Sequence, residues 1–259
     1  MAEGKTKIIW EIPCSDEVLI ESKDDITAGD GEKRDVMVGK AALATQTTVN
    51  CFRLLEEAGV QTHFIAQEDD TTFRAKRVNM IPIELVARRL AYGSFLKRNP
   101  HIPERTPFPS TTIEFFDKDD AMHDPLLLAD YDTQTVLRLD AKKPPRDGII
   151  DERPFESVPE LVIPRWGELR ATTKEVFEIL EGAWAKQNVT TVDMKIEAGL
   201  TETGDLLVAD VIDNDSWRIW PDGDPERMKD KQLYRDGKPI GDVEDAYKWV
   251  AEATDRFVE

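Results

Sequence analysis

The sequence is short of cysteine, of basic residues and of long apolar runs. Its two cysteines, Cys14 and Cys51, lie far apart among 259 residues, so neither a disulfide framework nor a CxxC metal motif can form. Acidic residues outnumber basic residues by 52 to 34, which gives a formal net charge of −18. That charge repels nucleic-acid phosphates and anionic lipid surfaces, so we expect no nucleic acid and no membrane as partners.

Nothing in the chain approaches the roughly 20 apolar residues of a membrane-spanning helix. Residues 1–10 contain Lys5 and Lys7 but no apolar run after them, unlike a signal peptide. Together with the small number of cysteines, these absences predict a cytoplasmic protein. Hydrophobic residues still make up 40% of the chain and include 6 tryptophans and 10 phenylalanines. We therefore expect a sizeable core and not a disordered acidic tail.

Strand and helix patterns are mixed along the chain without internal repeats, which favours an α+β fold over a strict parallel βαβ sheet. Residues 80–90 fit a buried strand or a short helix equally well. Residues 124–165 have no clean periodicity, and we expect an ordered but irregular surface excursion there. Alternation predicts strands at residues 5–12, 18–20, within 61–75, 191–197 and 206–212, and the first two suggest a hairpin at the start of the chain. Helical spacing predicts one helix at 36–58 with Gly59 as its cap, a second that starts at a capping box of Thr172 with Glu175, and a third at 243–257.

The hairpin expected over residues 192–212 carries the strongest chemical signal. If the loop between its strands has an even number of residues and is centred between Thr203 and Gly204, the numbers of two facing residues sum to 407. Glu197 then lies opposite Asp210. Facing carboxylates repel each other, and a Mg²⁺ ion would remove that cost while leaving room for substrate phosphates. Lys195 shares a face with Glu197 and suits a phosphate. An odd-length loop would break the register and leave a solvated acidic face, and this alternative stays open. The alternation directs Val192, Met194 and Ile196 inward and Asp193, Lys195 and Glu197 outward.

Two short segments place cations beside small residues. In residues 4–7, two lysines share a strand face beside a glycine and suit a polyphosphate; a Walker A loop would need another glycine five residues before Gly4. Arg88, Ser94 and residues 97–98 combine guanidinium groups, a hydroxyl and a neighbouring glycine, which suits a phosphate monoester. A solvated strand edge and a surface charge cluster are the alternatives.

Two further segments carry polar groups with two interpretations each. His123 beside Asp124 is either an acid–base pair or a polar turn before a proline. Residues 213–218 combine carboxylates and Arg218 with turn-forming residues. They suit a sugar hydroxyl and a phosphate, or form a well-bonded loop.

Six motifs occur in order along nearly the whole chain. They are GKTK at 4–7, TAGDG at 27–31, PIE at 82–84 leading through Arg88 to Gly93-Ser94, DAMHDP at 120–125, VDMKIE at 192–197, and residues 210–218. This set is similar to the SAICAR synthetases (phosphoribosylaminoimidazole-succinocarboxamide synthases) of purine biosynthesis. Residues 210–236 resemble in particular the synthetase half of the bifunctional animal enzyme. The carboxylase half of that enzyme has no counterpart in this sequence, so we expect a monofunctional chain.

The resemblance implies a two-lobed, ATP-grasp-like α+β fold with antiparallel sheets and flanking helices. Residues 1–80 would form a β-rich nucleotide-binding lobe, and residues 81–259 an α+β lobe with metal and substrate sites. The implied enzyme is an ATP-dependent carbon–nitrogen ligase that joins L-aspartate to the carboxylate of carboxyaminoimidazole ribonucleotide (CAIR). Its products are SAICAR, ADP and phosphate, formed through an acyl phosphate with Mg²⁺ as cofactor. A non-catalytic ATP-binding module and an acidic interaction protein are the alternatives, and a homo-oligomer stays open.

The resemblance also implies roles for individual residues. Two positions depart from the family's pattern: Tyr92 stands where Ala or Thr precedes the Gly-Ser, and Ala198 where Phe follows the Glu. Both departures affect packing beside the site and not its chemical groups. By position, Lys5, Lys7, Glu84 and Lys195 would bind ATP, Glu197 and Asp210 would hold Mg²⁺, Arg88, Ser94, Asp215 and Arg218 would bind CAIR, and Asp30, Lys118 and Asp124 would lie at the reacting groups.

The implied substrates are all anions, whereas the net charge of the chain is −18. A site for them must therefore be locally inverted in charge. Mg²⁺ and seven basic residues are expected to invert it: Lys5, Lys7, Arg88, Lys97, Lys118, Lys195 and Arg218.

Overall fold

The computed structural model describes residues 1–29, 32–158 and 162–259. The chain forms two compact units, and each contains more than one segment. The first break lies between Met80 and Ile81. The roles expected for residues 1–80 and 81–259 stay predictions. The first unit consists of Met1–Met80, Ile179–Thr191 and Ala198–Glu259, and the second of Ile81–Glu178 and Val192–Glu197.

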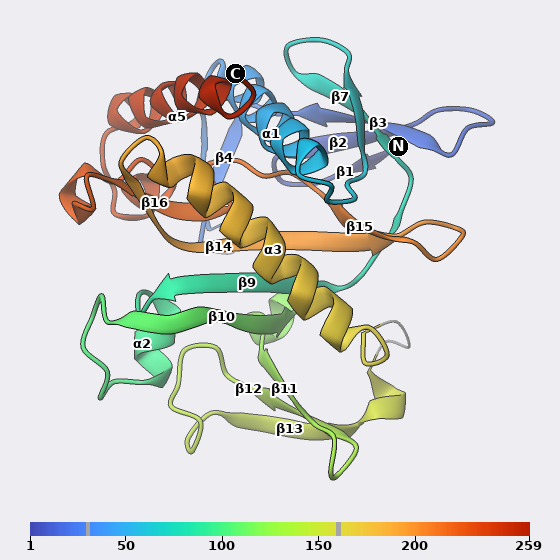
Figure 1. The fold of residues 1–259 in the computed structure, drawn as a ribbon, viewed down its shortest axis with the longest axis vertical. Coiled ribbons are helices and arrows are strands. Elements are labelled where there is room, and N and C mark those ends of the chain that lie inside the picture. Colours follow the sequence, from blue (N-terminus) through green and yellow to red (C-terminus); the bar gives the residue numbers. More distant parts are fainter. Residues whose placement is uncertain (30–31, 159–161) are drawn as a thin grey trace. The chain divides into compact units, whose positions relative to one another are not determined.

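A five-stranded antiparallel sheet begins the first unit (Figure 1). Its β2 (Lys7–Glu11) and β3 (Glu17–Ser22) form the hairpin predicted at the start of the chain. Ile20 and Phe73 face each other across two of its strands, and both are buried. The strand order is β1 (Ala2–Glu3), β2, β3, β7 (Thr72–Lys76) and β6 (Phe64–Gln67), and a separate pair joins β4 (Asp25–Ala28) to β5 (Lys33–Val36).

Two long helices of the first unit pack against each other (Figure 1). Helix α1 (Lys40–Glu57) buries Phe52 and Leu55 on the apolar face that its spacing predicts. It ends before Gly59, whose φ of +90° is the left-handed conformation typical of a glycine that follows a helix. Helix α5 (Ile240–Thr254) confirms the helix predicted at 243–257.

A second antiparallel sheet organises the second unit. The segment that fitted a strand or a helix equally well is a strand, β9 (Ile83–Leu90), and its residues 85–88 pair with residues 193–196 of β14 (Val189–Leu200). In this unit the strand order is β13 (Ile149–Pro154), β12 (Thr135–Leu139), β11 (Leu126–Asp130), β10 (Pro107–Asp117), β9 and β14. The antiparallel pairing and the separate helices confirm the α+β class.

The irregular excursion expected over residues 124–165 is wrong, because β11, β12 and β13 occupy much of it. Leu126 and Leu139 pack with Phe116 in one core cluster. The three strands have only five or six residues each, and polar turns separate them. So few alternations do not produce a periodic signal in the sequence.

The start expected for the third long helix is also wrong. Helix α3 (Trp166–Ala185) begins before the capping box expected at Thr172. Thr173 lies within the helix, where its hydroxyl donates a hydrogen bond of 2.6 Å to the carbonyl of Leu169. A threonine that bonds to the previous turn in this way is compatible with a helix interior.

The hairpin turn after β14 has an odd-length loop. Thr201 donates its backbone N–H to the carbonyl of Asp205 at 3.0 Å, which leaves three residues, 202–204, in the loop. Gly204 has a φ of +88°, the left-handed conformation that a three-residue hairpin loop needs. The register in which facing numbers sum to 407 therefore does not hold at this turn.

Strand β14 is buried on both faces, which corrects the outward face predicted for it. Asp193 and Glu197 are each only 5% exposed, and Lys195 is intermediate. The strand lies inside the sheet, where both faces are covered, so its charged residues need partners within the protein.

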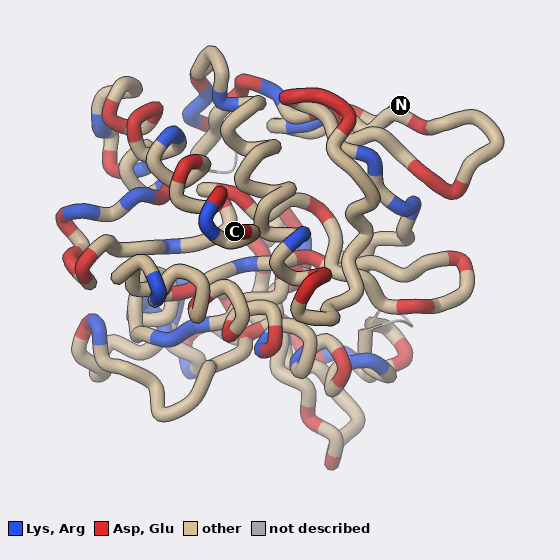
Figure 2. The backbone as a smooth tube through the Cα atoms, turned by 45° about the horizontal axis from the view of Figure 1, so that its top comes forward, with Lys and Arg blue, Asp and Glu red and all other residues tan. Residues whose placement is uncertain are grey.

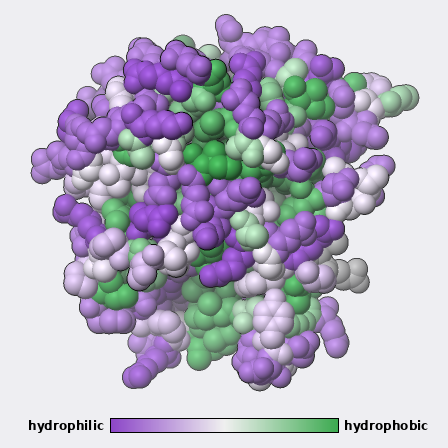
Figure 3. Space-filling view, viewed as in Figure 1, coloured by the Kyte–Doolittle hydropathy of each residue, from purple (hydrophilic) through white to green (hydrophobic). Residues whose placement is uncertain are grey.

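Charged side chains are distributed over the whole chain. Figure 2 shows acidic and basic segments interspersed along the backbone, and the face in Figure 3 is mainly hydrophilic with separate apolar patches. The net charge of the chain therefore does not come from one acidic tail. The remaining elements are β8 (Asn79–Met80), α2 (Ser94–Arg98), η1 (Asp120–Met122), η2 (Phe155–Ser157), β15 (Leu206–Ala209), β16 (Trp217–Pro221), η3 (Pro225–Arg227), α4 (Gln232–Arg235) and η4 (Asp255–Phe257).

Trp184 is the centre of an aromatic cluster in the first unit. Its ring is fully buried and meets Trp217 and Phe257 edge-on, with centroids 5.3 and 4.9 Å away. We expect Trp184→Ala to lower the free energy of unfolding by about 3–5 kcal/mol, because it leaves a cavity. Trp10→Ala is the matched control, since Trp10 is 39% exposed. Urea unfolding measures both variants, and equal losses would contradict this account of the core.

Candidate active site

A row of alternating charges crosses the sheet of the second unit. Lys195 on β14 lies between Glu84 on β9 and Glu197 on its own strand, with its Nζ 2.9 Å from Glu84 Oε1 and 3.4 Å from Glu197 Oε1. Lys118, which follows β10, places its Nζ 2.6 Å from Glu197 Oε2. Burial lowers the pKa of Lys195, but the two carboxylates outweigh burial and raise that pKa above its usual value. Lys195 is therefore a fixed positive charge.

Glu197 is the best candidate in this row for holding a metal ion. Its carboxylate is buried, and such a group is stable only beside cations. Lys118 supplies one of these cations from a side chain that is 41% exposed. Among the described residues, no cluster of three or more His, Cys, Asp or Glu side chains could hold a metal by itself. Mg²⁺ does not need such a cage, because it combines one or two carboxylates with water and substrate phosphates. The carboxylate oxygens therefore fit Mg²⁺.

A second cluster in the same sheet surrounds Arg88. This side chain is 4% exposed, and its Nε and Nη1 lie 2.6 Å from Glu114 and from Asp193. Its Nη2 donates to Ser94 Oγ at the start of α2, at 3.4 Å. Burial opposes the charge of Arg88, but Asp193 and Glu114 outweigh it and raise the pKa of the guanidinium. Arg98 pairs with the other oxygen of Glu114. The cluster thus fixes the Arg88 plane with one edge toward Ser94.

The segment after β10 holds two of the expected catalytic residues. Lys118 donates its backbone N–H to the carbonyl of Pro82 at 3.1 Å, which ties it to the start of β9. His123 and Asp124 have φ angles of +58° and +53°, a conformation that costs a non-glycine residue roughly 1–2 kcal/mol. Asp30, the third expected catalytic residue, lies outside the described residues.

In the first unit, Asp210 forms an ion pair with Lys7 of β2. His63 Nε2 lies 3.0 Å from the carbonyl oxygen of Asp210. Burial, followed by the charge of Lys7, lowers the pKa of His63 to about 3. The imidazole is therefore neutral near pH 7, and Nε2 must carry its proton because a carbonyl only accepts. Lys5 lies in the exposed bend before β2.

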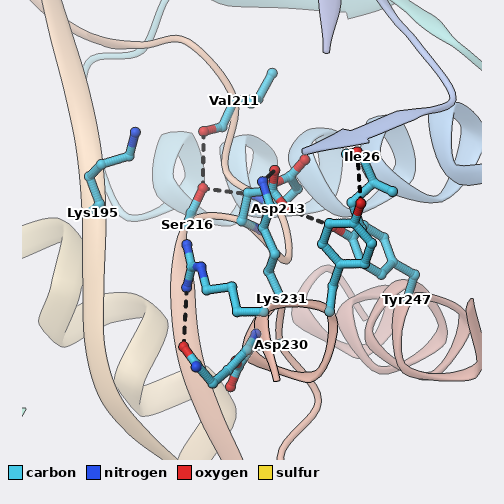
Figure 4. Close-up of polar contacts among 12 residues, drawn as sticks. Ile26, Lys195, Val211, Asp213, Ser216, Asp230, Lys231 and Tyr247 are labelled. Atoms are coloured by element: carbon cyan, nitrogen blue, oxygen red, sulfur yellow. Dashed lines mark hydrogen bonds and ion pairs between the residues drawn. The ribbon is translucent and has the colours of Figure 1, made fainter. Parts of the chain in front are cut away.

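A polar network surrounds Asp215 in the first unit, and Figure 4 labels three of its members, Asp213, Lys231 and Tyr247. The hydroxyl of Tyr247 and the ammonium of Lys231 each donate to its carboxylate at 2.5 Å, and its backbone N–H donates to Asp213 at 2.8 Å. Burial alone would raise the pKa of Asp215, but Lys231 and Lys40 lower it. Burial and the neighbouring Asp215 raise the pKa of Asp213. Asp215 is thus an ionised carboxylate with a fixed orientation.

The comparisons with known proteins identify the family. The family model for SAICAR synthetase matches residues 1–254. The chain belongs to the SAICAR synthetase family. A phosphoribosylaminoimidazole-succinocarboxamide synthase from Chloroflexus aggregans is 45% identical over 263 residues, covering 99% of this chain and 96% of that protein.

The resemblance to an animal enzyme is also confirmed. The "Multifunctional protein ADE2" of Gallus gallus is 43% identical over 268 residues, which are 99% of this chain and 58% of that protein. The chain therefore spans just over half the length of this relative. Among solved structures, a "SAICAR synthetase (Type-2) in complex with ADP" superposes with a TM-score of 0.81 at 32% identity, covering 98% of this chain and 96% of that one.

The structure brings several expected site residues of this SAICAR synthetase family member together within each unit. Glu84, Lys118, Lys195 and Glu197 form one row in the second unit, where Arg88 also meets Ser94. In the first unit Lys7 meets Asp210. Glu197 and Asp210 belong to different units, so a metal ion shared between them stays a prediction. No helix in the described part of the chain is long and apolar enough to cross a membrane.

Sequence reasoning missed five residues of these networks. Asp193 was predicted only to face outward on β14. The available signal was that Asp193 shares a strand face with Lys195 and Glu197 while the other face of that strand is apolar. Nothing marked Glu114 as the partner of both Arg88 and Arg98. The other three are Lys40, Lys231 and Tyr247, whose meeting at Asp215 depends on contacts between distant segments.

Lys231→Met tests the network around Asp215. The variant leaves Asp213 and Asp215 short of a cation, so we expect the free energy of unfolding to fall by about 2–3 kcal/mol. This is less than for a fully buried pair, because the Asp215 side chain is 23% exposed. Urea unfolding measures the loss. Lys238→Met removes an exposed lysine as the control, and equal midpoints for the two variants would refute a stabilising role for Lys231.

Proposed function

We propose that the chain is an ATP-dependent ligase that joins L-aspartate to the carboxylate of CAIR and yields SAICAR, ADP and phosphate. The observation that carries this proposal is the row Glu84–Lys195–Glu197–Lys118, which sets fixed cations beside a buried carboxylate. Such a row suits a transfer reaction between anions, in which positioning and charge neutralisation do most of the work. The family membership and the ADP-bound neighbour support the same reaction.

ATP would be bound by lysines that the sequence predicts to suit phosphates. We assign Lys5 and Lys7 to the phosphates of ATP, together with Lys195, whose ammonium Glu84 orients. Glu197 and Asp210 are the residues that would hold Mg²⁺. When bound, this ion neutralises phosphate charge and polarises the phosphoryl group.

CAIR would be bound through its phosphate and its ribose. The edge of the fixed Arg88 guanidinium that Glu114 and Asp193 do not hold donates to Ser94 Oγ, and a guanidinium beside a hydroxyl suits a phosphate monoester. We assign Arg218 to the same phosphate. Asp215 is ionised and acceptor-only, so it suits the ribose hydroxyls, which donate hydrogen bonds.

The chemistry would proceed in two transfers. A carboxylate oxygen of CAIR attacks the γ-phosphorus of ATP, the bond to the β-phosphate oxygen breaks, and ADP leaves. The amine of aspartate then attacks the acyl carbon, loses a proton and expels phosphate, which takes the former carboxylate oxygen with it. Asp30, Lys118 and Asp124 are proposed to lie at these reacting groups. No protein nucleophile is needed.

Substrate omission tests the reaction. We expect sustained, multiple-turnover release of ADP from ATP only when CAIR and L-aspartate are both present, since the acyl phosphate formed from CAIR is consumed productively only by the amine. A coupled ADP assay with each substrate left out in turn measures this dependence. ATP binding by calorimetry without any ADP release would support a non-catalytic module and overturn the proposal. The biosynthetic family supports a cytoplasmic location.

Glu197→Gln tests the role of the buried carboxylate. The amide keeps the shape but loses the charge, so we expect kcat for ADP release to fall by about 10²–10³-fold. The same assay measures the loss. Glu202→Gln is the matched control, because Glu202 lies exposed in the turn after β14 and its loss leaves the site intact. Turnover of Glu197→Gln at the control's rate would refute the metal assignment.

A further inference from the structure

Strands β11–β13 have no part in the proposed reaction, yet they carry a buried arginine that contacts the candidate active site. Arg138 of β12 is 3% exposed and lies among three carboxylates. Its Nη2 is 2.9 Å from Asp119, its Nε 3.4 Å from Asp117, and its Nη1 3.5 Å from Asp151 of β13. Asp117 and Asp119 flank Lys118 in the sequence. One guanidinium thus holds both neighbours of a proposed catalytic lysine.

Asp119 also organises the backbone of the segment that follows it. Its carbonyl accepts hydrogen bonds from the backbone N–H groups of Met122 and Asp124, at 2.9 and 3.2 Å. His123 and Asp124 are held there with positive φ. Residues in such conformations keep them only where the surroundings over-determine the backbone. The contact between the Asp119 carboxylate and Arg138 anchors this segment, residues 118–124, to the sheet.

The charges around Arg138 show how strongly the segment depends on it. Asp117, Asp119 and Asp151 are three acidic side chains around one arginine, and Arg153 is a second cation beside Asp151, at 3.0 Å. Burial raises the pKa of Asp117 above its usual value even though Arg138 lowers it, and Asp119 and Asp151 add to the rise. Without Arg138, these carboxylates would repel one another, and the Asp119 side chain would lose its ion pair with the sheet.

We propose that Arg138 is a positioning residue that holds Lys118 and Asp124 in their reactive places through Asp119. The inference rests on the proposed function, which sets these two residues at the reacting groups. It gives strands β11–β13 a role: they are the support of the catalytic segment. Arg138 itself touches no substrate, so its effect must pass through residues 118–124.

The test compares Arg138→Met with Arg153→Met by steady-state kinetics. Both changes remove one positive charge beside Asp151, but Arg153 is 41% exposed and its ion pair is with Asp151. For Arg138→Met, we expect kcat/KM for aspartate to fall about 100-fold, because groups at the reacting centre are misplaced. The KM for ATP should stay within about threefold of the wild-type value. Arg153→Met should match the wild type. All rates are normalised to the folded fraction.

Asp119→Ala is the second variant and covers the case in which Arg138→Met fails to fold. It removes the contact with Arg138 at a side chain that is 33% exposed and keeps the Asp119 carbonyl. We expect the same selective fall in kcat/KM for aspartate, with faster amide exchange over residues 118–124 than in the wild type. Arg138→Lys should restore only part of the activity, since an ammonium lacks the planar fork that spans three carboxylates.

Three outcomes would overturn the positioning role. One is equal kinetics for Arg138→Met and Arg153→Met; another is unchanged kinetics for Asp119→Ala. The third is a loss of activity that disappears once the rates are normalised to the folded fraction, which marks a purely structural residue. If the wild-type enzyme turns over ATP at an unchanged rate when CAIR is omitted, the proposed function itself has failed.

Discussion

The candidate site depends on one constraint: a carboxylate buried in a sheet must be neutralised. Glu197 lies on a strand with both faces covered, and Lys195 and Lys118 supply the positive charge beside its carboxylate. Glu84 in turn holds Lys195. Each charge contacts the next one, so a change at any member of this row alters the pairing of its neighbour. Such a row is rigid, and rigidity is what a transfer between anions requires of its catalyst.

The same rule explains how a chain with a net charge of −18 can accept three anionic substrates. Its basic residues at the candidate sites are not simply exposed cations. Arg88 is fixed by Glu114 and Asp193, and Lys231 by Asp215. Carboxylates therefore orient the cations. Arg138 extends this arrangement to the strands that support residues 118–124.

Local patterns predicted the elements whose periodicity is long or whose ends are marked. Helix α1, its terminal glycine and the first hairpin follow from spacing alone. Strands β11–β13 were missed because five residues do not establish a period, and the hairpin register failed because a single extra loop residue shifts every pair. The motifs identified Lys195, Glu197 and Arg88. Their contacts with Glu114 and Asp193, and the contact of Lys231 with Asp215, form only when distant strands and helices pack together. Local spacing in one sequence does not predict such long-range contacts.

The central claim is that ATP activates the carboxylate of CAIR by direct phosphoryl transfer, before aspartate attacks. Oxygen transfer tests it most directly. CAIR labelled with ¹⁸O in its carboxylate is converted with unlabelled ATP and aspartate in unlabelled water, and the released phosphate is analysed by mass spectrometry. The account predicts that each phosphate carries one ¹⁸O atom from the substrate. Phosphate that contains no ¹⁸O would show that the carboxylate never bonds to phosphorus, and the account would be wrong.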